Sequence, residues 1–230
     1  MRHVAGYKFH LILVTTLLLP LPTWAIPTIT CHCFTDRSYD AVHPAAADPY
    51  FLATTQNSFF AVVFTTDKKS VVMKKQRGIS SDDLWIAYWV ALHSGVSPDT
   101  LLQARQNKQA WQDILTSQRL SPKVLGAHYT MARIANSSIA HLAETVVNDL
   151  FLQYQLMSDM ELSAVRQAGI TNQELIIATV IAAKMKLPVT KTYLEVKSRT
   201  KTWGALLMEA KIDPKNLQRE ISLLLKLSPV

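Results

Sequence analysis

Two cysteines and the histidine between them, Cys31-His32-Cys33, are the residues whose types and spacing most suggest chemistry. The chain has no other cysteine, so an intrachain disulfide must join Cys31 to Cys33 in a very small, strained ring, and strained bridges are easily reduced. For a metal ion the run offers three adjacent ligands, and no second cluster of cysteine and histidine supplies the rest. A structural or intermolecular disulfide, a labile redox pair, a metal site and two idle thiols are all compatible with the sequence.

No other run of residues matches a known catalytic pattern. A glycine-rich phosphate loop, an H-E-x-x-H zinc motif and a G-x-S-x-G nucleophile motif are absent from the sequence. The histidines elsewhere in the predicted helices have no evident catalytic partner nearby in sequence: His93, His128 and His141. We therefore predict no catalytic residue and no cofactor, while a site assembled from distant residues stays open.

Three polar residues follow the cysteines closely enough to influence them. Asp36, Arg37 and Asp40 could orient Cys33 or His32. The surrounding residues 26–47 are rich in Pro, Asp, Thr and Ala and show no apolar period, which favours a solvated, irregular arm instead.

The first 25 residues are typical of a secretory signal. Arg2 and Lys8 flank the start of an apolar run, Leu11–Leu19, and Thr23-Trp24-Ala25 provides small residues at the −3 and −1 positions of a cleavage site. The apolar run is shorter than the roughly 20 residues of a membrane span. We expect cleavage near Ala25, a periplasmic or secreted protein and no transmembrane span after cleavage; the alternative is an uncleaved anchor.

The mature chain is mildly basic. Removing residues 1–25 takes away two of the 24 Lys and Arg residues and none of the 17 acids, so the formal net charge falls from +7 to +5. This charge favours an anionic surface or another envelope protein as partner without selecting one. The basic segments 68–77 and 184–201 could contact anionic lipid or cell-wall polymers, although solvated helix faces are the favoured explanation for them.

One tryptophan-centred pattern occurs twice. The first copy is WQDILTSQRLSPKVLG, the second is TWGALLMEAKIDPKNLQ, and shifts of 91 to 92 residues superpose residues 78–125 on 169–217. If the second copy has one extra residue before this point, Leu194 in the second copy matches Leu102 in the first. The matched positions are caps, turns or apolar faces, so the repetition preserves a shape. We predict structural roles for the motif residues Trp111, Ile114 and Pro122 in the first copy and Trp203, Leu206 and Pro214 in the second.

These patterns predict an all-α protein, because capping residues and apolar periods recur and glycine is scarce. Two tandem copies of a multi-helix unit are expected to pack as one pseudo-symmetric globule behind the irregular arm. The predicted segments are a signal peptide over 1–25, the Cys-x-Cys arm over 26–47, N-terminal helices over 48–77, helical repeat 1 over 78–126, connecting helices over 127–168 and helical repeat 2 over 169–230.

Local signals place several helices. Asp48 is expected to cap a helix whose first position is Pro49. Residues 59–66, FFAVVFTT, are compatible with either helix or strand. Residues 84–92 are apolar on every face, which is typical of a helix buried on all sides. Between the copies a helical stripe is expected over Ile139, Leu142, Val146, Leu150 and Tyr154, with His141, Glu144, Asn148 and Asp149 off it.

The repeated pattern resembles two known kinds of motif. The first is a helix-turn-helix, which would place Lys123 and Lys215 near DNA phosphates. The leucines of its second helix indicate core packing instead, and export would separate the protein from DNA. We therefore expect no nucleic-acid partner. The repeated pattern also resembles a module of small exported bacterial proteins. That module has a Trp, often followed by Gly, an Ile or Leu three residues after the Trp, and then Leu-x-Pro-x-x-Leu. Only the second copy has that glycine, Gly204. The resemblance implies an exported helical protein and assigns no catalytic residue.

Our leading hypothesis is a periplasmic, non-enzymatic helical protein that binds a partner or has an accessory role in the envelope, because the duplication repeats a shape without repeating reactive residues. The alternative is a thiol redox or metal-handling protein acting through Cys31-His32-Cys33. A third hypothesis, a helix-turn-helix-like nucleic-acid binder, requires that the chain is not exported.

Overall fold

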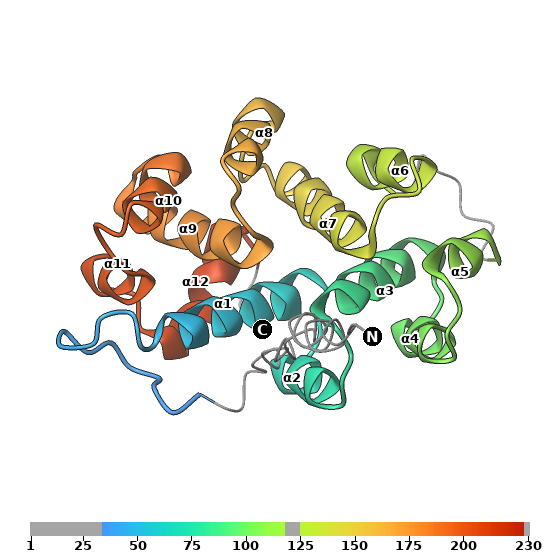
Figure 1. The fold of residues 1–230 in the computed structure, drawn as a ribbon, viewed down its shortest axis with the longest axis horizontal. Helices are drawn as coiled ribbons and strands as arrows, with labels where there is room; N and C mark the ends of the chain where they lie inside the picture. Colours follow the sequence, from blue (N-terminus) through green and yellow to red (C-terminus); the bar gives the residue numbers. More distant parts are fainter. Residues whose placement is uncertain (1–33, 118–124, 228–230) are drawn as a thin grey trace, which may run out of the picture.

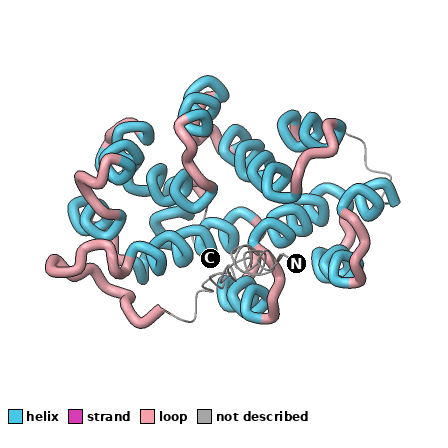
Figure 2. The backbone as a smooth tube through the Cα atoms, viewed as in Figure 1, coloured by secondary structure: helices cyan, strands magenta, loops and turns pink. Residues whose placement is uncertain are grey.

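The computed structural model describes residues 34–117 and 125–227, which form twelve α-helices, one short 3-10 helix and no strand (Figure 1, Figure 2). The all-α prediction is therefore confirmed for this part of the chain. The ambiguous run 59–66 is helical up to residue 63, where α1 (Asp48–Val63) ends. None of the described helices is both long and apolar enough to cross a membrane. The predicted signal peptide, Cys31-His32-Cys33 and Pro122 lie outside the described residues.

Most helices are short and are joined by turns of a few residues. After α1 come, in chain order, α2 (Lys68–Gln76), α3 (Ser81–Ser94), α4 (Pro98–Gln106), α5 (Trp111–Ser117), α6 (Ala127–Ile134), α7 (Ile139–Gln153), α8 (Asp159–Gln167), α9 (Asn172–Met185), α10 (Val189–Lys197), α11 (Trp203–Glu209), η2 (Pro214–Asn216) and α12 (Leu217–Leu224).

Helix positions recur along the chain at a nearly constant spacing. The helix α1 begins at residue 48 and α7 at residue 139, a separation of 91, and the same separation holds between α2 and α8, α3 and α9, and α4 and α10. The helices α5 and α11 begin at residues 111 and 203, which is 92 apart. Left-handed residues recur too: Gly78 has φ 88° and Gly169 has φ 89°, while Lys108 has φ 65° and Arg199 has φ 59°. We call α1–α6 the first half and α7–α12 the second half.

The first helix of each half packs against the other half. The helix α1 lies on α9 and α12, whereas α7 lies on α3 and α6 (Figure 1). Aromatic rings also connect the halves: the ring centroids of Phe59 in α1 and Phe151 in α7 lie 5.7 Å apart, while Phe60 packs within the first half on Trp85 at 4.7 Å and Tyr88 at 4.9 Å. Because one apolar core runs through both halves, neither half buries its own apolar surface alone.

The tryptophan motifs contribute to this core. Trp111 and Ile114 of α5 are buried, as are Trp203 and Leu206 of α11. Pro214 opens the 3-10 turn η2, which the Asp213 side chain caps by accepting the backbone N–H of Lys215. The helix α3 is buried from Leu84 to Val90 as expected, but Leu92 near its end is exposed.

The sequence-based matching of Leu194 in α10 with Leu102 is wrong. Leu194 is 53% exposed, whereas Tyr193, which lies 91 residues after the buried Leu102, is buried. The inserted residue lies after α10 instead, because five residues separate α10 from α11 and four separate α4 from α5. Asn148 and Asp149, placed off the apolar stripe of α7, are nevertheless buried, and hydrogen bonds from α8 and α6 compensate the burial of their polar groups.

Candidate functional site

A pocket of about 540 Å³ lies where the arm, α1 and the segment from α11 to η2 meet. Its volume falls within the range of about 300–1,000 Å³ that is usual for small-molecule sites. Because α1 belongs to the first half and α11 to the second, the pocket joins the two halves. Its lining residues are Arg37, Ser38 and Tyr39 of the arm, Tyr50 and Phe51 of α1, and Gly204, Leu207, Met208, Ile212, Asp213, Pro214 and Lys215.

The carboxylate of Asp48 holds α11 in place beside this pocket. It accepts the backbone N–H groups of Trp203 at 3.1 Å and Gly204 at 2.9 Å. Thr202 caps the same helix end, because its hydroxyl accepts the N–H of Ala205 at 3.2 Å. The expected capping of α1 by Asp48 is therefore wrong: Ala47 occupies the cap position of α1, and the Asp48 side chain satisfies unpaired amides of a helix in the other half.

Gly204 allows the arm and α1 to approach α11 closely. A β-carbon added at Gly204 would lie 2.8 Å from Cδ2 of Tyr39 and 2.9 Å from Cε2 of Phe51. Any other residue would push these rings away from the wall of the pocket. This contact explains physically why the second copy of the motif has Trp-Gly, while the first copy has the exposed Gln112 after Trp111.

The beginning of the described arm is fixed to the same wall. The ring of Phe34, which follows Cys33 in sequence, makes an edge contact with Tyr50 at 6.0 Å between centroids. The guanidinium of Arg37 lies 6.0 Å from the centroid of the Tyr50 ring, and its Nε donates to the carbonyl oxygen of Phe34 at 3.1 Å. Arg37, one of the polar residues considered as a partner for the cysteines, thus lines the pocket.

The lining of the pocket combines apolar walls with a few charged side chains. Its walls are aromatic and aliphatic, and Met208 remains 58% exposed within it. Two cations, Arg37 and Lys215, face one carboxylate, Asp213, so the lining carries one excess positive charge. Within the described residues no group of three or more His, Cys, Asp or Glu side chains could hold a metal ion. This combination suits an apolar ligand that carries an anionic group.

A polar cluster that sequence reasoning missed lies in another part of the fold. Nδ1 of His128 lies 2.9 Å from Oδ1 of the buried Asp149, and Nε2 lies 3.1 Å from Oδ1 of Asp159. Asp149 also accepts the backbone N–H groups of His128 at 3.2 Å and Tyr129 at 3.0 Å, which caps α6. The cluster therefore joins α6, α7 and α8. His128 appeared isolated because Asp149 lies 21 residues away, beyond a turn and on another helix.

Gly126 provides a local signal for this cluster. Its φ is 84°, a left-handed value, and a β-carbon there would lie 2.2 Å from Oδ2 of Asp149. Only glycine therefore lets Asp149 reach the start of α6. His128 and Asp159 of the cluster line a shallow pocket of about 510 Å³ together with His141, while Asp149 caps α6.

The comparisons with known proteins identify no relative: no family model matches this chain, and neither a curated protein nor a solved structure is detectably similar to it.

Proposed function

We propose that this chain is an exported, non-enzymatic helical protein of the bacterial envelope that binds an apolar, negatively charged ligand between its arm and α11. The observation that carries the proposal is the pocket of about 540 Å³ at the junction of the arm, α1 and α11. Ordered segments from three parts of the chain enclose it, and its lining offers aromatic surface and an excess cation.

The proposal includes a duplicated architecture. The near-constant spacing of the helix starts and the exchanged packing of α1 and α7 support two related units arranged about a pseudo-twofold axis, each beginning at α1 or α7. Such an arrangement gives a rigid frame, because each unit completes the core of the other. The arm and Gly204 lie outside what the two halves share, and both line the pocket.

The distribution of charge supports an anionic ligand or surface. Residues 184–227 contain ten Lys and Arg and four Asp and Glu, a formal charge of +6. The remaining mature residues contain twelve basic and thirteen acidic residues, a charge of −1. The pocket opens beside this basic part of the chain, which raises the local concentration of anions.

A fluorescent apolar anion tests the binding site. Anilinonaphthalene sulfonate should bind the native protein saturably, and Met208→Trp should weaken this binding by filling the pocket. Leu223→Trp is the matched control, because Leu223 is similarly exposed on α12 and does not line the pocket. Equal binding by both variants would show that the probe binds elsewhere and would contradict the proposed site.

The location has its own test. The protein recovered from a periplasmic extract should begin at Ile26 when its N-terminus is sequenced. A cytoplasmic protein that retains residues 1–25 would contradict export and would reopen nucleic-acid binding.

A second candidate function, thiol redox or metal handling through Cys31-His32-Cys33, is favoured by one contact. Phe34, the residue after Cys33, packs on Tyr50, and Tyr50 lines the pocket. Thiol titration of the exported protein with and without reductant, together with metal analysis, separates this candidate from simple binding. No reducible bridge and no bound metal would eliminate it.

A further inference from the structure

We propose that α10 docks on the surface of an anionic lipid bilayer, with Leu194 at the boundary of the acyl chains and basic side chains at the headgroup phosphates. The contact is peripheral, because the exposed side of one short helix makes it. No residue of α10 lines the pocket beside the arm, so the proposal does not depend on the ligand there.

One side of α10 packs into the fold and the other is exposed. Thr192 and Tyr193 are buried, whereas Lys191, Leu194 and Lys197 are exposed. The three exposed residues lie three positions apart, so they share one side of the helix. They also line a shallow groove of about 600 Å³. The exposed side of α10 therefore places one apolar side chain between two cations.

The cations of this surface have no acidic partner. The segment 186–199 contains four basic residues and one acid, Glu195. The carboxylate of Glu195 lies 3.3 Å from Nζ of Lys201, so it is paired outside the segment. No ion pair in the described part of the chain includes the four basic residues, which are Lys186, Lys191, Lys197 and Arg199. All four positive charges are thus uncompensated within the fold.

The corresponding helix of the first half, α4, shows that the fold does not require this chemistry. At the spacing of 91 residues, α4 has Thr100, Gln103 and Gln106 where α10 has lysine, leucine and lysine. These three positions of α4 are exposed as well. Two helices with the same place in their halves therefore expose different side chains, and the difference lies on surface that core packing does not constrain.

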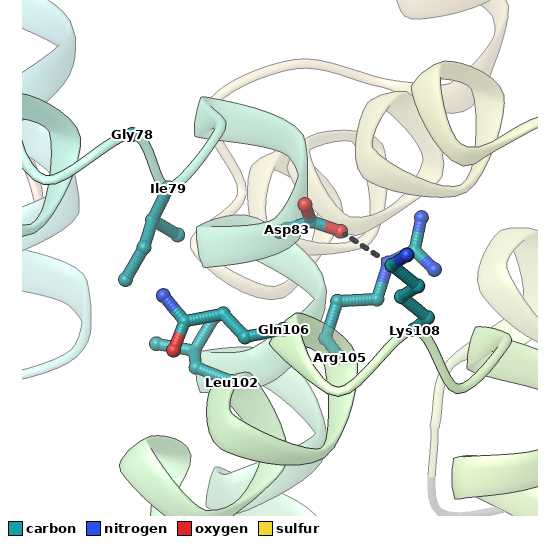
Figure 3. A pocket seen from close by; sticks show the side chains of 7 residues that line it. All are labelled: Gly78, Ile79, Asp83, Leu102, Arg105, Gln106 and Lys108. Carbon is teal, nitrogen blue, oxygen red and sulfur yellow. Dashed lines mark hydrogen bonds and ion pairs between the residues drawn. The ribbon is translucent and has the colours of Figure 1, made fainter.

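The charges around α4 are largely balanced within the fold. In the corresponding segment, 95–108, the only acid is Asp99, which pairs with a lysine of α2. Figure 3 shows Arg105 directed at Asp83, and their side chains pair at 3.1 Å. Among the described residues, Lys108 is then the one cation of this segment without an ionic partner. Four uncompensated cations around α10 against one around α4 make α10 the surface that suits an anionic partner.

A bilayer fits this combination better than a soluble polyanion does. Basic residues near an anionic membrane surface each raise the partition coefficient by about a factor of five. An exposed leucine gains nothing from a soluble polyanion, but it leaves water when it enters the boundary between headgroups and acyl chains. The aliphatic stems of the lysines on either side of Leu194 can lie along the same boundary while their ammonium groups stay in water.

Co-sedimentation of the chain without residues 1–25 with lipid vesicles tests the proposal. These residues are omitted because their apolar run would itself bind lipid. We expect binding to phosphatidylcholine vesicles that contain about 30% phosphatidylglycerol, at least about tenfold weaker binding to pure phosphatidylcholine, and a loss of binding as salt is raised. Equal binding to both kinds of vesicle, or binding to neither, would overturn the proposal.

Two substitutions in α10 locate the contact. Lys191→Thr and Leu194→Gln install the residues of α4 and should each lower the partition coefficient about fivefold. The matched controls make the same substitutions at exposed positions of α2 and α12 and should leave it unchanged: Lys69→Thr and Leu223→Gln. A control that weakens binding as much as its counterpart in α10 would refute this location.

The pattern of losses identifies the partner. If Lys191→Thr weakens binding and Leu194→Gln does not, the contact is purely electrostatic, which fits a soluble anionic polymer and contradicts docking on a bilayer. Met208→Trp should not affect vesicle binding, because Met208 lines the pocket beside the arm. A loss with Met208→Trp would assign the lipid to that pocket and would overturn the role of α10.

The first half provides a gain-of-function test. Thr100→Lys, Gln103→Leu and Gln106→Lys together build the exposed side of α10 on α4. In a chain that also carries Lys191→Thr and Leu194→Gln, these changes should raise the partition coefficient at least about fivefold. Circular dichroism melting verifies the fold of each variant. A folded variant that recovers no binding would contradict the argument from the comparison of the two halves.

Discussion

Asp48 and Gly204 are separated by 156 positions in the chain, and the Asp48 carboxylate accepts the Gly204 backbone N–H at 2.9 Å. The first residue of α1 thereby caps α11, a helix of the second half. The same residue pair sets one wall of the proposed binding pocket, because Gly204 lines it and Asp48 orients the helix that carries Gly204.

Removing this cap should destabilise the protein. Asp48→Ala leaves two N–H groups of α11 without an acceptor and should lower the free energy of unfolding by about 1–2 kcal/mol. Asp48→Asn keeps one acceptor oxygen and should cost less. Urea denaturation of both variants checks the order, and equal losses would show that the hydrogen bonds to α11 contribute nothing.

The same carboxylate should make stability depend on pH. Burial raises the pKa of Asp48, and the N–H groups of Gly204 and Trp203 offset this only in part. An acid whose pKa is higher in the folded state stabilises the fold when protonated, and this contribution is lost as the pH rises from its unfolded pKa of about 4 through its folded pKa. The free energy of unfolding of the wild type relative to Asp48→Asn should therefore fall as the pH is raised through this window. Urea denaturation at a series of pH values measures it; a constant difference would refute the assignment.

Gly204→Ala should loosen the arm. The new β-carbon would approach Tyr39 and Phe51 to 2.8 and 2.9 Å, an overpacking that typically costs about 1–3 kcal/mol. The corresponding change in the first half, Gln112→Ala, alters an exposed residue and should change stability by less than about 0.5 kcal/mol. Thermal or urea unfolding compares them, and similar values would mean that the contact with the arm is unimportant.

Substitution of the two motif tryptophans should show that both contribute similarly to stability through packing, and that Trp111 also contributes through a hydrogen bond. Trp111→Ala and Trp203→Ala should each cost about 3–5 kcal/mol, because both side chains are buried. Trp→Phe should cost more at position 111, where Nε1 donates to Asp83 at 2.7 Å. Losses below about 1 kcal/mol for both alanine variants in urea denaturation would contradict their role in the core.

The helical fold and many of its boundaries could be predicted from local patterns. Ser80 and Thr171 cap α3 and α9 by accepting N–H groups three residues later, and Gly95 ends α3 in a left-handed conformation. Such signals act within a few residues of a helix end, so a linear sequence displays them. The repetition of Trp111 as Trp203 likewise indicates similar surroundings for the two side chains, and both are buried.

The exposure of Leu194 in α10 and the burial of Asp149 in α7 could not be predicted from local patterns. Which residues of α10 are buried depends on the side of the helix that meets α9. The second copy of the repeat has one more residue than the first, and local patterns allow this residue to lie either before or after α10. Asp149 has the polarity of a surface residue, and only the approach of α6 across Gly126 gives its carboxylate buried partners.

The sequence alone determined that this chain is helical, that its helices begin and end at capping residues, and that a tryptophan-centred pattern is repeated, because these properties follow from short-range backbone and packing rules. Only the tertiary structure decided that Asp48 caps α11, that Gly204 admits Tyr39 and Phe51, and that Asp149 reaches the start of α6 across Gly126. These outcomes depend on which distant surfaces meet, and a pair of residues far apart in a sequence carries no local sign that they will come into contact.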